Sequence, residues 1–118
     1  MLTRPELQAF LDRMAEAYSA GDARACADMF CEQAQLHSPF APPAIGRAAI
    51  RALHEDWTGD GGAKSFAVLD HGGNAGLAWC LCRFSEGAVN GDGTSLLVLE
   101  PGPDGDWLVR SCCLFGDD

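Results

Sequence analysis

Residues 46–71, GRAAIRALHEDWTGDGGAKSFAVLDH, contain the change of pattern that decides the fold. The first half places residues at steps of three and four, so that they share one helical face: Ile50, Leu53, His54 and Trp57. The run Gly59-Asp-Gly-Gly62 then breaks the helix. After it, residues 65–71 are typical of a strand. This stretch therefore predicts that a helical first part gives way to a sheet.

The chain before this stretch is predominantly helical. Thr3-Arg4-Pro5-Glu6 is a capping box with proline in the first turn. It predicts a helix that ends at Gly21 and has one apolar stripe: Leu7, Phe10, Leu11, Met14 and Tyr18. Asp22 can cap a second helix, whose buried face would hold Cys26, Met29 and Phe30.

The strands follow one another with short turns. A short strand is predicted at residues 35–38, and Pro39, Pro42 and Pro43 are expected to stop it and force an extended bend. Further strands are predicted at 65–71, 75–85, 94–100 and 107–115. Short connections favour antiparallel neighbours. Residues 1–118 are thus expected to form one α+β domain, with three N-terminal helices packed on a curved antiparallel sheet.

The charge of the chain excludes two classes of partner. There are 17 acidic and 8 basic residues, a formal net charge of −9. Such a surface repels nucleic acid and anionic membranes. No apolar run approaches the length of a membrane span, and the charged N-terminus does not resemble a signal peptide. A cytoplasmic location is expected.

The six cysteines fit no known ligand set. They form no CxxC pair, and no histidine stands at zinc-finger spacing. In a reducing compartment they are expected to be reduced, metal-free core residues. No cofactor is expected. Lys64-Ser65 follows a glycine run that superficially resembles a phosphate-binding loop, but Ala63 stands where that loop needs glycine.

Several short motifs are spread over roughly the whole chain: Tyr18-Ser-Ala-Gly-Asp22, Met29-Phe30, Leu36-His-Ser-Pro-Phe40, Ile45-Gly-Arg47, Ile50 and Asp104-Gly-Asp-Trp107. Together they resemble the nuclear transport factor 2-like superfamily, with the SnoaL-like polyketide cyclases and the ketosteroid isomerases most similar. The resemblance implies a cone-shaped sheet wrapped on a long helix, a pocket at its wide end, and a homodimer.

The catalytic residues of the ketosteroid isomerases are not matched. Their general-base aspartate corresponds to Ser38, and their oxyanion-hole tyrosine corresponds to Met14. Their oxyanion-hole aspartate falls near Leu97. Proton abstraction beside a carbonyl needs a positioned base and a stabilised oxyanion. The resemblance therefore implies a relative without this machinery.

His54 is the catalytic candidate, because its helical face should turn it toward the interior. Burial would lower its pKa and leave a neutral ring that could act as a base. The alternative is a core histidine bonded to a backbone carbonyl or to Tyr18. Arg110 would bind a carboxylate or enolate if it faced inward, although an outward arginine on an exposed strand face is the more common case. The full set expected to line the pocket is Met14, Tyr18, Leu36, Ser38, Phe40, Leu53, Trp57, Leu97 and Arg110.

Two functions remain open from the sequence. The first is a SnoaL-like domain that binds a small apolar molecule, with weak isomerase-, cyclase- or hydratase-type chemistry. The second is a non-catalytic dimeric module with a filled cavity. A homodimer is expected in either case, because residues 77–82 are apolar on both strand faces and one face needs a partner.

Overall fold

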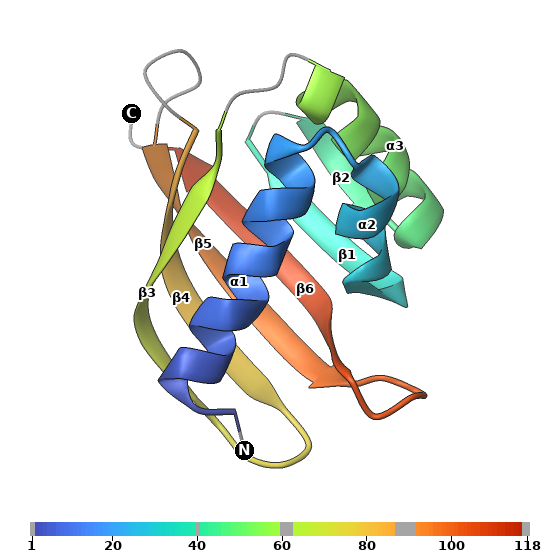
Figure 1. Cartoon of the computed structure of the whole chain (residues 1–118). Helices are drawn as coiled ribbons and strands as arrows, with labels where there is room; N and C mark the ends of the chain where they lie inside the picture. Colours follow the sequence, from blue (N-terminus) through green and yellow to red (C-terminus); the bar gives the residue numbers. More distant parts are fainter. Residues whose placement is uncertain (1, 40, 60–62, 87–91, 117–118) are drawn as a thin grey trace.

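The computed structural model describes residues 2–39, 41–59, 63–86 and 92–116. Three helices lie on one side of a sheet, and the long first helix crosses its face (Figure 1). The helices are α1 (Arg4–Ser19), α2 (Ala23–Asp28) and α3 (Arg47–Gly59). The strands are β1 (Phe30–Ser38), β2 (Ala41–Ile45), β3 (Ser65–Gly73), β4 (Ala78–Ser85), β5 (Asp92–Pro101) and β6 (Trp107–Gly116). The α+β architecture predicted from the sequence is confirmed.

The sheet is mixed rather than purely antiparallel. Its order in the described residues is β2-β1-β6-β5-β4-β3, and β1 pairs with β6 in parallel. The expectation of an antiparallel sheet is wrong at this one pairing. Parallel neighbours require a long connection. Here α3 and the strands β3, β4 and β5 lie between β1 and β6 in the chain, so the connection is long enough.

Strand β2 was not expected. Residues 41–45 pair antiparallel with β1, where the sequence predicted that prolines stop the strand at residues 35–38 and force an extended bend. The structural reason is that β2 is an edge strand, with a neighbour on one side only. Pro42 and Pro43 lack an N–H, and an edge strand can spare that donor. Strand β1 also starts at Phe30, a residue assigned by its spacing to the second helix.

Side chains of α1 bind the opposite edge of the sheet. The Gln8 amide donates to the Phe66 carbonyl at 2.8 Å and accepts from the Val68 N–H at 3.0 Å. These contacts satisfy backbone groups of edge strand β3 that would otherwise attract another strand. The predicted capping box of Thr3 and Glu6 is confirmed at the start of α1.

The curvature of the sheet comes from bulges. Register shifts occur between Val68 and Asp70 in β3, and opposite Val98 and Leu99, where Arg110 is the extra residue in β6. A bulge bends and twists the strand that contains it. The sheet thereby wraps around α1 as a cone, with an apolar inner face. Within the described residues, no helix is long and apolar enough to cross a membrane.

Candidate functional site

His54 is buried in α3, with 4% of its surface exposed. Its Nδ1 lies 2.8 Å from the carbonyl oxygen of Ile50, one turn earlier in the same helix. A carbonyl can only accept, so Nδ1 must carry the proton. In the neutral ring, Nε2 is then left with a lone pair. The hydrogen bond thus selects the tautomer in which Nε2 can accept a proton.

Three aromatic rings surround His54. Its ring centroid lies 5.5 Å from that of Trp57, 5.9 Å from Phe30 and 6.3 Å from Tyr18. The contact with the Ile50 carbonyl is the one expected of a core histidine bonded to the backbone, which is the alternative to a catalytic role. The Tyr18 hydroxyl donates to the Trp57 carbonyl at 3.5 Å.

The environment of His54 favours the uncharged imidazole. Burial, the largest influence, lowers the pKa of His54 because it removes water from the charged form. The hydrogen bond to Ile50 opposes this and raises the pKa. The positive charge of Lys64 lowers the pKa again, and the negative charge of Glu86 raises it. The net result is a pKa below the ordinary histidine value.

Lys64 and Glu86 form an ion pair close to this histidine. In the β3–β4 hairpin Val68 pairs with Cys82, and Phe66 pairs with Phe84. Side chains alternate between the two faces of a strand, so the next pair on the same inner face is Lys64 with Glu86. Their Nζ and Oε1 atoms lie 3.1 Å apart, and the side chains are only 6% and 17% exposed.

The Lys64 ammonium lies among aromatic rings at the end of the cone where α1 and α3 finish (upper end in Figure 1). It is 4.2 Å from the centroid of Tyr18, 5.2 Å from Phe66 and 5.4 Å from Phe84. Ring faces attract cations. Tyr18 is therefore close to two polar groups, the His54 ring and the Lys64 ammonium.

Ser95 adds a second unusual polar group to the inner face. Its side chain is on β5, directly across from Cys82 of β4, and is 1% exposed. In the described part of the chain its Oγ has no hydrogen-bond partner. A buried hydroxyl without a partner is unfavourable by roughly 1–3 kcal/mol.

The residues predicted to line a pocket lie in different parts of the structure. Met14, Leu36 and Leu97 belong to the buried apolar core, and Leu53 and Trp57 pack against it. Tyr18 is buried beside His54. Ser38 is half-buried at the end of β1, and Phe40 lies outside the described residues.

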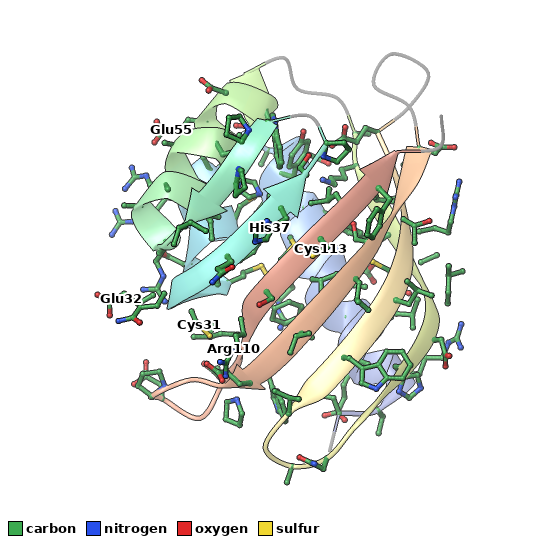
Figure 2. The ribbon with its side chains drawn as sticks, turned by 180° about the vertical axis from the view of Figure 1, so that it is seen from behind. Cys31, Glu32, His37, Glu55, Arg110 and Cys113 are labelled. Atoms are coloured by element: carbon green, nitrogen blue, oxygen red, sulfur yellow. The ribbon has the colours of Figure 1, made fainter. Side chains whose placement is uncertain are left out.

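Arg110 does not line a pocket inside the cone, contrary to the prediction. It is exposed on the outer face of the sheet, where its guanidinium donates to the Glu100 carboxylate at 3.2 Å (Figure 2). The inward orientation on which an anion-binding role depended is therefore wrong. The β5–β6 pairing explains it: fully buried Val109 pairs with Leu99 and Ser111 pairs with Val98, so Arg110 is the extra residue of a bulge and its side chain lies on the outer face.

A groove of about 640 Å³ lies apart from His54 and the residues predicted to line its pocket. It is formed by α1 and the β5–β6 turn, and its lining includes Phe10, Arg13 and Trp107. None of the residues predicted to line the pocket contributes to it. An enclosed pocket around His54 stays a prediction.

No protein-family model and no curated protein matches the sequence. Solved structures do match. An NTF2-like protein with a cystatin-like fold from Novosphingobium aromaticivorans is 19% identical, with a TM-score of 0.77 over 98% of this chain and 82% of that chain.

Two further similar structures have informative descriptions. A ketosteroid isomerase-like protein from Erwinia carotovora atroseptica is 16% identical, with a TM-score of 0.74 over 96% of this chain and 98% of that one. A protein from Catenulispora acidiphila, solved in complex with S-DNPA, is 22% identical, with a TM-score of 0.73 over 96% and 92%. These matches show that the chain has the nuclear transport factor 2-like, cystatin-like fold.

Proposed function

We propose that this protein binds a small, largely apolar molecule inside its cone and moves a proton on it through His54. The observation that supports this is the position of the His54 ring among the rings of Phe30, Trp57 and Tyr18, with the Nδ1 proton held by Ile50. The bond to Ile50 is also the one expected of a core histidine, but it leaves Nε2 able to accept a proton. A buried base of this kind suits general acid–base catalysis near neutral pH. The Catenulispora protein, of the same fold, is described in complex with S-DNPA.

The chemistry needs no other reactant. Nε2 of His54 takes a proton from an activated C–H or O–H group of the ligand, and the ring becomes an imidazolium held by the Ile50 carbonyl. The proton then returns to a different atom of the same ligand, which is an isomerisation or a step of a cyclisation. Tyr18, His54, Lys64 and Glu86 come together at one end of the cone. Such convergence of polar groups is typical of an enzyme site.

The alternative is a non-catalytic dimeric module whose cone is filled by its own side chains. The observation that favours it is the packing of Met14, Leu36 and Leu97 into one continuous apolar core. The outer face of the sheet also carries exposed apolar side chains, among them Leu77, Trp79 and Leu96. We include in both versions of the proposal a homodimer formed through that face.

Binding and deuterium exchange of 2-tetralone, a neutral ketone with acidic C–H groups, test the proposal. Calorimetry should show binding to the wild type, and NMR in D₂O should show faster exchange next to the carbonyl with wild type than with His54→Gln. Exchange at the same rate in both proteins would contradict the catalytic part and support the module.

Two tryptophan variants locate the bound ketone. Leu97→Trp fills the cone, whereas Leu96→Trp adds the same volume on the outer face of the same strand. If the cone binds the ketone, Leu97→Trp stays folded and loses binding, and Leu96→Trp keeps it. If the cone is already packed, Leu97→Trp loses about 1–3 kcal/mol of stability, and wild type binds no ketone.

A further inference from the structure

We infer that Lys64 recognises an anionic group, so that the ligand of the cone carries a carboxylate or similar oxyanion on its apolar body. This inference rests on the proposed function, because it requires that the cone takes a ligand. It adds the chemical class of that ligand and the residue that selects it.

The first support is where the fold places the lysine. The inner face of the β3–β4 hairpin runs from Val68 and Cys82, through the rings of Phe66 and Phe84, to Lys64 and Glu86. The apolar residues lie inside the cone, and the charged pair of Lys64 and Glu86 lies at the open end of the hairpin, away from its turn. A ligand with an apolar body and one charged end matches this gradient.

The second support is the bonding capacity of the ammonium group. A lysine ammonium has three donors. Among the described residues its one carboxylate partner is Glu86, while the rings of Tyr18, Phe66 and Phe84 offer their faces. Ring faces attract the charge but leave N–H donors able to bind a further oxyanion.

The third support is energetic. Placing two charges in a nearly buried position carries a desolvation penalty that their attraction barely offsets, so apolar residues of similar size would stabilise the fold as well or better. The 6% exposed Lys64 is thus poorly explained by stability alone. A role in binding gives a reason for a charge on this face.

The fourth support is independent of the lysine. The Ser95 hydroxyl is 1% exposed and has no partner in the described residues. It lies on the inner face of the sheet, across from Cys82 of the same β3–β4 hairpin that leads to Lys64 and Glu86. It can donate to a second polar atom of the same ligand.

The test compares 2-naphthoate with 2-naphthamide, which share an apolar body and differ in charge. Calorimetry on the wild type should show naphthoate binding about tenfold more tightly, the equivalent of about 1.4 kcal/mol. Lys64→Met should weaken naphthoate about tenfold and leave naphthamide within about twofold. The control Arg110→Met removes an exposed positive charge on the outer face and should change neither affinity.

A second variant acts in the opposite direction. Glu86→Gln removes the internal carboxylate that competes for the ammonium, so naphthoate should bind several times more tightly. Equal wild-type affinity for both probes, or an unchanged or weaker naphthoate affinity in Glu86→Gln, would overturn the role of Lys64 while cone binding stands. Failure of both naphthyl probes and of 2-tetralone to bind would overturn the proposed function itself.

Discussion

His54 derives its proposed chemistry from one hydrogen bond inside its own helix. The Ile50 carbonyl fixes the proton on Nδ1, and the surrounding rings of Phe30, Trp57 and Tyr18 keep water away. Neither the hydrogen bond at Nδ1 nor the burial among rings is enough by itself to make His54 a base. Together they hold an uncharged ring with its lone pair turned away from the bonded carbonyl.

The lowered pKa of His54 predicts a pH dependence of stability. The unfolded chain binds a proton near the ordinary value of 6.5, whereas the folded protein resists it because of burial. The contribution of His54 to stability is complete above pH 6.5 and is lost as the pH falls below it. Urea unfolding at several pH values should show this decline.

His54→Gln should flatten the dependence, since glutamine does not titrate. Equal slopes for wild type and His54→Gln between pH 7 and 5 would contradict the account.

The burial of His54 could be predicted from its spacing with Ile50, Leu53 and Trp57, but the nearby ion pair of Lys64 with Glu86 could not. Lys64 follows the glycine run that breaks the helix, and nothing in the sequence fixes its pairing with Glu86. That pairing depends on the register of β3 with β4. Ser95 looks like any small strand residue until its neighbours are known.

Several cysteine side chains pack inside the protein, on helix α2 and on the inner face of the sheet. The six cysteines are present as free thiols, and Cys26 and Cys112 are buried. Burial raises the pKa of Cys26 to about 11 and that of Cys112 to about 12. A thiol reacts through its thiolate, so both groups should be inert at neutral pH.

Alkylation with iodoacetamide at pH 8, followed by mass spectrometry, tests this prediction. The half-buried Cys113 on the outer face (Figure 2) should react first, and Cys26 and Cys112 only after unfolding. All six thiols should react in urea. Modification of Cys26 as fast as Cys113 in the folded protein, or fewer than six reactive groups in urea, would contradict the prediction.

At the level of elements, local patterns predicted the helices better than the sheet. The capping box at Thr3 and the cap at Asp22 are formed by contacts three residues apart, and both are confirmed. Strand β2 was not predicted, because Pro42 and Pro43 were expected to end the preceding strand. Whether proline breaks a strand depends on which strand lies at the edge, and edge position is a property of the whole sheet.

At the scale of the molecule, the exposed apolar side chains on the outer face of the sheet predict a dimer. Trp79 is 36% exposed there, near the exposed Leu77 and Leu96. Light scattering at micromolar concentration should report twice the mass of the chain. Trp79→Lys should shift the protein toward monomer, because it places a charge in the proposed interface.

Glu16→Lys makes a matched control for the dimer, since it adds a lysine on the exposed side of α1. It should leave the mass unchanged. A monomeric wild type at high micromolar concentration would contradict the proposed dimer.

The central claim is that a neutral His54 presents Nε2 to a ligand in the cone, and long-range ¹H–¹⁵N NMR of its ring tests this most directly. His54→Gln assigns the signals by removing them. At pH 7.5 we predict a ring protonated at Nδ1 only, as the Ile50 hydrogen bond requires, and a Nε2 signal that moves when 2-tetralone is added. A ring protonated at Nε2, or a Nε2 signal unmoved by saturating ketone, would contradict the claim.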